Sequence, residues 1–90
     1  MKPVRWLPHA LQNIVDREVD RRAAEQAVMA PEFTVPSGAG RNVCMRKYYD
    51  TVLGQEMLVR AVVEETDTEI VVVTVYKTSQ IFKYLKGVKP

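Results

Sequence analysis

The sequence predicts an α+β fold in which two N-terminal helices pack on one face of a twisted antiparallel sheet of about four strands, followed by a short C-terminal helix. Two observations predict this class. Apolar residues recur at helical spacing in the first third of the chain, and runs of β-branched residues separated by turn-forming residues follow. Helices that precede meandering strands are typical of an antiparallel sheet with helices on one side. Ninety residues suffice for one core, so residues 1–90 are expected to form a single domain.

The first predicted helix begins at Pro8 and ends near Arg17. Its expected apolar side consists of Leu7, Leu11, Ile14 and Val15, and its polar side of His9, Asn13 and Asp16. Asp20 is a good N-cap for a second helix over residues 21–30, which Pro31 ends. Small alanines on the inner side of this helix would let it lie close to a sheet.

The strands follow Pro31. Residues 33–35 can form a short strand that the segment from Pro36 to Gly40 ends, and residues 41–49 form the next strand. The stretch from Met57 to Ser79 then predicts a hairpin, because two β-branched runs flank a highly charged turn at 64–69. Ser79 is the expected cap of a last helix over residues 80–86.

The register of this hairpin decides which residues share a face, because a slip of one residue moves every side chain to the opposite face. An even loop at Thr66-Asp67 would scatter the polar side chains. An odd loop of three residues, from Thr66 to Thr68, would place Arg60, Thr74 and Tyr76 together and leave the other face wholly apolar. The odd register segregates polar from apolar residues better, as a sheet with one covered face requires.

Composition excludes several classes of protein. With 47% hydrophobic and 27% charged residues the chain is not disordered. No apolar run reaches the roughly 18 residues of a membrane span, so we expect a cytoplasmic protein without a membrane partner. Cys44 is the only cysteine and is expected to pack, and no cofactor or metal is expected. A domain of this size is marginally stable, so either a monomer or a homodimer is plausible.

Charge points toward an anionic ligand, although the net charge of +2 is small. Acids cluster at the tip of the hairpin, whereas lysines crowd the C-terminal segment. A guanidinium, a hydroxyl and a phenol on one face, from Arg60, Thr74 and Tyr76, are donors that can bind phosphate. The alternative is that Arg60 pairs with a carboxylate such as Glu64 and that the basic residues form solvated surfaces.

Several segments together carry a family resemblance. They are His9-Ala10 opening a helix, Ala30-Pro31 ending one, Gly40-Arg41, and the stretches LVRAVVEE and EIVVVTVYKTSQIFKYLK. The chain resembles a family of small bacterial and archaeal domains of unknown function. That family is distantly similar to RelE/ParE-type toxins and to the barnase, colicin and RelE-like ribonuclease fold group. The resemblance implies a RelE-like fold, with characteristic polar positions at His9, Arg41, Arg60, Thr74 and Tyr76. Asn13 stands where the family usually has an arginine.

Such a fold would support metal-independent cleavage of RNA, in which the ribose 2′-hydroxyl attacks the adjacent phosphate. On this hypothesis His9 transfers protons, Arg60 stabilises the phosphorane and Tyr76 orients the nucleophile or stacks on a base. The predicted substrate-binding residues are Arg41, Arg46, Thr74, Lys77 and Thr78. A small antitoxin protein would be the expected partner of such an enzyme.

Two alternatives remain open on the same fold. The first is a non-catalytic domain that binds RNA or the ribosome, in which His9 caps or packs its helix and lies too far from Arg60 for proton transfer. The second is a protein-interaction domain that pairs an exposed strand with a partner.

Overall fold

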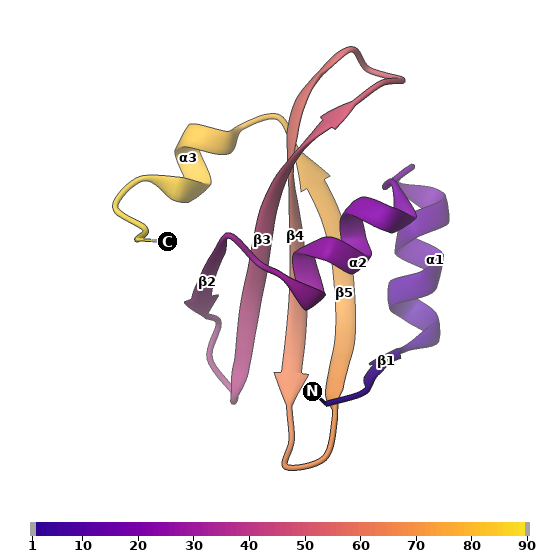
Figure 1. The fold of residues 1–90 in the computed structure, drawn as a ribbon, viewed down its shortest axis with the longest axis vertical. Coiled ribbons are helices and arrows are strands. Elements are labelled where there is room, and N and C mark those ends of the chain that lie inside the picture. The colour runs from indigo at the N-terminus through magenta and orange to yellow at the C-terminus, as the bar shows by residue number, and fades with distance from the viewer. Residues whose placement is uncertain (1, 90) are drawn as a thin grey trace.

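The computed structural model describes residues 2–89 and confirms the α+β class (Figure 1). Five strands form one sheet in the order β1-β5-β4-β3-β2. The elements along the chain are β1 (Val4–Trp6), α1 (Pro8–Asp16), α2 (Arg21–Met29), β2 (Phe33–Pro36), β3 (Arg41–Asp50), β4 (Gln55–Glu65), β5 (Ile70–Thr78) and α3 (Ile81–Leu85). No helix among the described residues combines the length and the apolar character needed to cross a membrane.

The sheet has one strand more than predicted, and it is mixed rather than antiparallel. The added strand is β1, which runs parallel to β5 and places Trp6 opposite Val72. Three residues give too short a pattern to be recognised as a strand, and only the long-range pairing with β5 makes them one. The side chains of Val4 and Trp6 pack against the core.

The turn of the main hairpin is longer than predicted. Glu65 lies opposite Ile70, so the turn consists of the four residues between them instead of three. Close to this turn, Val63 lies opposite Val72. The prediction of an odd loop is therefore wrong at the turn itself.

A β-bulge restores the predicted faces farther along the hairpin. The register shifts between Val62 and Val63, so that Val73 has no partner and Val62 lies opposite Thr74. Arg60 consequently lies opposite Tyr76, on the same face as Thr74. The polar face predicted from the sequence exists. It results from the extra residue in β5 and not from the length of the loop.

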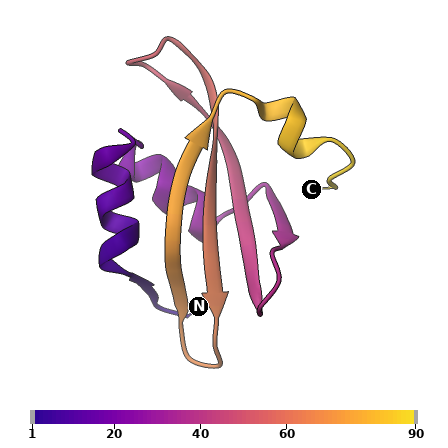
Figure 2. The ribbon, with the colours of Figure 1, turned by 180° about the vertical axis from the view of Figure 1, so that it is seen from behind.

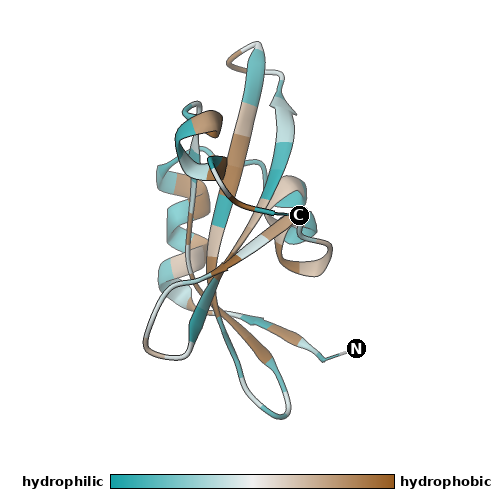
Figure 3. Cartoon of the chain, turned by 90° about the vertical axis from the view of Figure 1, so that its left-hand side faces the viewer, coloured by the Kyte–Doolittle hydropathy of each residue, from teal (hydrophilic) through white to brown (hydrophobic). Residues whose placement is uncertain are grey.

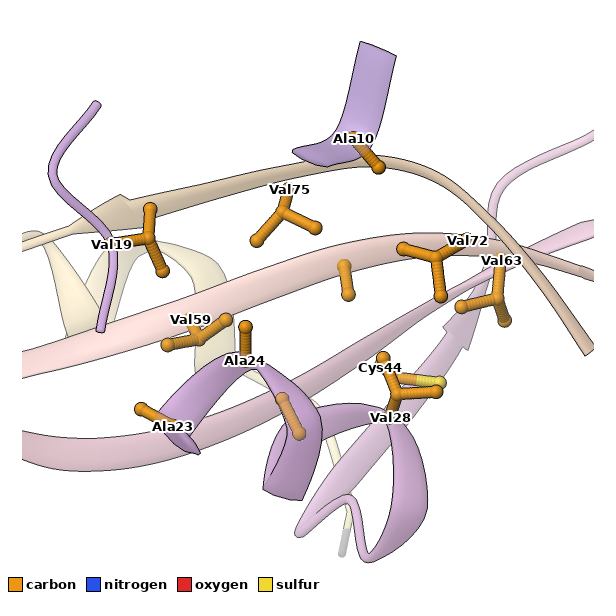
Figure 4. Close-up of a cluster of buried hydrophobic side chains, with 12 residues drawn as sticks. Ala10, Val19, Ala23, Ala24, Val28, Cys44, Val59, Val63, Val72 and Val75 are labelled. Atoms are coloured by element: carbon orange, nitrogen blue, oxygen red, sulfur yellow. The ribbon is translucent and has the colours of Figure 1, made fainter. Parts of the chain in front are cut away.

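The sheet is covered on both faces. α2 crosses one face, in front of the strands in Figure 1 and behind them in Figure 2, and α3 packs its Ile81, Tyr84 and Leu85 on the other. Apolar residues follow one another in runs along β4 and β5 (Figure 3), as expected for strands that are covered on both faces. The larger core (Figure 4) consists of Ala10, Val19, Ala23, Ala24, Ala27, Val28, Cys44, Val59, Ala61, Val63, Val72 and Val75.

Two short sequence signals in the helices have different outcomes. Asp20 caps α2 as predicted, because its carboxylate accepts hydrogen bonds from the backbone N–H groups of Arg22 and Ala23. Ser79 does not cap α3, whose N-cap is Gln80 without a side-chain hydrogen bond.

α1 is rotated relative to the prediction. Its buried residues are Ala10 and Asn13, whereas Val15 is 69% exposed. The cause lies in β5, whose edge β1 covers only as far as Val72. Beyond that point the strand edge faces α1, and polar side chains of the helix are needed to bind its backbone groups.

Asn13 and its neighbour Arg17 supply those bonds. The side-chain oxygen of Asn13 accepts hydrogen bonds from the N–H of Val75 at 3.2 Å and from the Thr74 hydroxyl at 2.6 Å. The Arg17 guanidinium donates to the carbonyl of Val75 at 3.1 Å. Side chains of α1 and of the residue after it thus occupy the places that a further strand would fill.

Candidate functional site

Arg60 is held in the middle of β4 by residues from three other elements. Its Nε donates to the Met45 sulfur at 3.4 Å, and its Nη1 donates to the Tyr76 hydroxyl. Its Cζ lies 4.2 Å from the centroid of the Tyr84 ring in α3, which is a cation–π contact. Because β3, β5 and α3 each supply one contact, the half-buried guanidinium has a fixed orientation.

No carboxylate among residues 2–89 forms an ion pair with Arg60. Glu64, the alternative partner considered from the sequence, pairs with Arg41 at 3.2 Å instead. The Nη2 of Arg60 has no hydrogen-bond partner among the described residues. Among the described residues, every buried side-chain nitrogen or oxygen has a hydrogen-bond partner. Because Nη2 has none, it is not buried and reaches solvent. Arg60 therefore presents an uncompensated positive charge with a free donor.

A second cation lies against the same aromatic ring. Lys83 places its Nζ 5.5 Å from the centroid of Tyr84 and forms no ion pair with a described residue. Because both charges lie close to the same centroid, at 4.2 and 5.5 Å, they are at most about 10 Å apart. This separation is close to the screening length at 0.1 M salt. Two like charges at this separation repel each other, and a bound anion would relieve that repulsion. We call Arg60, Tyr76, Lys83 and Tyr84 the Arg60 site.

Two of the predicted arginines lie outside the Arg60 site. Arg41 is at the start of β3, where its guanidinium is engaged by Glu64. Arg46 lies opposite Val59, a residue of the core beneath the helices, and donates to the carbonyl of Ala30 at 2.8 Å. Arg46 therefore points to the face opposite Arg60.

The predicted threonines have structural partners. The Thr74 hydroxyl donates to Asn13, which ties β5 to α1. The Thr78 hydroxyl accepts a hydrogen bond from the N–H of Gln80 at 3.0 Å, at the point where the chain leaves β5 for α3. Both share the face of Arg60, since Thr74 lies opposite Val62 and Thr78 opposite Leu58.

His9 is not brought to the Arg60 site. It is the exposed second residue of α1, and no hydrogen bond or ion pair joins it to a described residue of the site. In Figures 1 and 2, α1 and α3 lie on opposite sides of the molecule with the long strands between them. Among the three residues predicted to be catalytic, Arg60 and Tyr76 are in contact and His9 is apart.

Lys77 belongs to a separate polar cluster on the face that α2 crosses. Its ammonium group lies 2.9 Å from the Asp50 carboxylate and donates to the carbonyl of Glu18 at 2.7 Å. The Tyr48 hydroxyl donates to the same carboxylate at 2.9 Å. The hydrogen bond from Lys77, supported by the N–H of Leu53, holds the pKa of Asp50 well below its usual range. Burial, followed by the bond to Asp50, raises the pKa of Tyr48.

A cavity of about 290 Å³ lies beside this cluster. It is lined by Glu18, Val19, Asp20, Tyr48, Asp50, Thr51 and Val52. Three carboxylates in the lining make the cavity unsuitable for phosphate. Within residues 2–89, no group of three His, Cys, Asp or Glu side chains is arranged to hold a metal ion.

Sequence reasoning did not identify Asp50 or Asn13 as central residues. Asp50 ends a strand before a turn, and its oxygen accepts the backbone N–H groups of Val52 and Leu53, a local role that its position could have suggested. Its pairing with Lys77 joins β3 to β5 and has no local signal.

Comparison with known proteins identified no relative of this chain. Neither family models, curated proteins nor solved structures gave a match to the chain. The RelE-like relationship stays a prediction. The chemical conclusion accordingly rests on the geometry of the Arg60 site, which has the charge and the open donor to bind an anion, and two aromatic rings that fix the guanidinium.

Proposed function

We propose that this protein is a non-catalytic RNA-binding domain that holds a backbone phosphate at the Arg60 site. The observation that carries the proposal is the half-buried guanidinium of Arg60, which has no carboxylate partner among the described residues and keeps its Nη2 open to solvent. Arginine binds phosphate oxygens through charge-assisted hydrogen bonds, which are stronger than those between neutral groups.

The neighbours of Arg60 support a phosphate as the anion. Lys83 adds a second positive charge beside the Tyr84 ring. Contacts to phosphate supply much of the affinity of RNA-binding proteins and carry no sequence information. RNA, instead of another phosphate-bearing ligand, is what the resemblance to RelE-type proteins implies.

Cleavage of RNA would require a proton-transfer group beside the phosphate. Tyr76 contacts Arg60, but His9 lies on α1 at the other side of the strands. An imidazole has an ordinary pKa near neutrality, whereas a phenol ionises about 3 units higher and is a weak base at pH 7. The placement of His9 therefore favours binding over catalysis, which was the first alternative considered from the sequence.

The binding proposal is tested with the full chain and a fluorescent oligoribonucleotide of mixed sequence. Fluorescence anisotropy at increasing salt gives the affinity and its salt dependence. We expect Arg60→Gln to weaken binding about tenfold and to reduce the salt slope by about one. Arg22→Gln is the matched control, because Arg22 is an exposed arginine of α2 on the other face of the sheet. Equal effects of the two variants would contradict the proposal.

A second measurement separates binding from cleavage. Induced expression of the wild-type chain should leave growth and bulk RNA intact. Growth arrest with RNA cleavage that is lost in Tyr76→Phe or in His9→Ala would instead establish the endoribonuclease, and only then would an antitoxin partner be expected.

A further inference from the structure

α3 and the chain that follows it form a basic surface with an exposed ring. Phe82 is 80% exposed although it is a large apolar residue. Lys83 is its neighbour in the chain, and Lys86 lies one helical turn farther on. No Asp or Glu occurs after Glu69, so this segment has positive charge without local compensation.

A second exposed ring, opposite Glu56, lies on the same face of the sheet. Tyr49 is 64% exposed on β3, two residues after Lys47. Lys47 lies opposite Leu58, which is buried beneath α3, so both β3 residues belong to the face that carries the Arg60 site. Each of the two exposed rings thus has a lysine close to it in the chain.

On the basis of the proposed function, we propose that the bound RNA is single-stranded, with a base stacked on Phe82 while neighbouring phosphates contact Lys83 and Arg60. A ring that stands free on a basic surface offers its face to an unstacked base, and every base can stack on it. In a duplex the base faces are already stacked, so a helical ligand would contact the lysines but leave Phe82 unused.

Charge complementarity selects this occupant over an apolar protein partner. A protein segment that buried Phe82 would also have to cover Lys83 and Lys86, which have no ion-pair partners among the described residues. A nucleic acid strand supplies both groups, since each nucleotide has a base with a flat ring and a negatively charged phosphate. The two occupants use Phe82 differently, since a protein contact depends on apolar area and stacking depends on an aromatic face.

The test compares one 12-nucleotide oligoribonucleotide, free and annealed to its complement, by fluorescence anisotropy at 50 mM salt with the full chain. The wild type should bind the free strand about tenfold more tightly than the duplex. Phe82→Ala and Phe82→Leu should each lose about tenfold for the free strand and little for the duplex, while Phe82→Trp retains binding. Because the side chain is exposed, these variants should fold, which thermal unfolding followed by circular dichroism verifies.

Three results would overturn the inference, and they are distinguishable. Equal binding of strand and duplex without an effect of Phe82→Ala would leave the proposed function intact and remove the single-strand preference. Full binding by Phe82→Leu would show an apolar contact instead of stacking. No binding of either RNA would overturn the proposed function itself.

Discussion

The ammonium group of Lys77 lies 2.9 Å from the carboxylate of Asp50, and the two side chains are only 12% and 7% exposed. This pair joins β5 to the end of β3 on the face that α2 crosses, opposite the Arg60 site. The same carboxylate accepts hydrogen bonds from Tyr48 and from two backbone N–H groups of the turn. A lysine predicted to bind substrate is therefore engaged in holding two strands and a loop together.

Acid should destabilise the protein through Asp50. Its pKa is lowered in the folded state by the hydrogen bond from Lys77, so the folded state binds this proton more weakly than the unfolded chain does. Its contribution to the free energy of unfolding is thus complete above about pH 5 and is lost progressively as the pH falls through about 4 and below. Urea unfolding followed by circular dichroism between pH 7 and pH 3 measures this loss.

The matched variant for this prediction is Asp50→Asn. It should be less stable than the wild type at pH 7 and should lose less stability on acidification. The pair between Arg5 and Glu69, which lowers the pKa of Glu69, is unchanged in this variant and accounts for part of any residual slope. An acid limb as steep as that of the wild type would show that Asp50 is not its source.

Tyr48 should ionise at a higher pH than an ordinary tyrosine. Burial and the hydrogen bond to Asp50 both raise its pKa. The folded state thus favours the neutral phenol, and the resulting stabilisation is present below about pH 10 and lost as the pH rises further. Absorbance at 295 nm follows tyrosine ionisation, and the wild type should show a step at high pH that Tyr48→Phe removes. A late step that persists in this variant would contradict the assignment.

Asn13→Ala should destabilise the fold by about 1–3 kcal/mol, because it leaves the buried N–H of Val75 without an acceptor. Gln12→Ala is the neighbouring control. The side chain of the exposed Gln12 bonds, among residues 2–89, only to Asp16 in the same helix, so this variant should change stability by less than about 0.5 kcal/mol. Urea unfolding at pH 7 gives both values. Equal losses would mean that α1 does not depend on Asn13 to bind the edge of β5.

Tyr84→Ala should loosen α3 from the sheet. The ring contributes apolar contact and a cation–π interaction with Arg60, the latter about 0.5–1 kcal/mol. Tyr84→Phe keeps the ring and should behave as the wild type. Limited digestion with trypsin provides the measurement, because Lys83 and Lys86 lie in or beside the helix and should be cut several-fold faster in the alanine variant. Unchanged cleavage in Tyr84→Ala would show that other contacts hold α3.

Local signals predicted much of this fold. Asp20 marked the start of α2 because a cap involves only residues within one turn. The sequence also predicted that Arg60, Thr74 and Tyr76 share a face, because this register separates polar from apolar residues. That prediction is correct although the predicted loop length is wrong.

Three of the failures share one cause, which is that tertiary neighbours decided the structure. β1 exists as a strand only because β5 lies beside it. Asn13 is buried because the strand edge behind it needs an acceptor, and a helical pattern read alone assigned it to the polar side. His9 could be placed near Arg60 only by analogy, since nothing in the sequence fixes on which side of the sheet α1 lies.

The unpaired Val73 lies between the turn of the hairpin and the pair of Arg60 and Tyr76. A change in the length of the turn therefore need not change the face on which Arg60 lies. Val71, Val72 and Val73 are identical, so deleting any one of them gives the same shortened chain. In that chain the ladder would be continuous and Thr74 and Val72 would keep their present faces, since adjacent residues of a regular strand alternate. The bulge at Val73 therefore lets the hairpin gain or lose a residue near its turn while the Arg60 site stays in place.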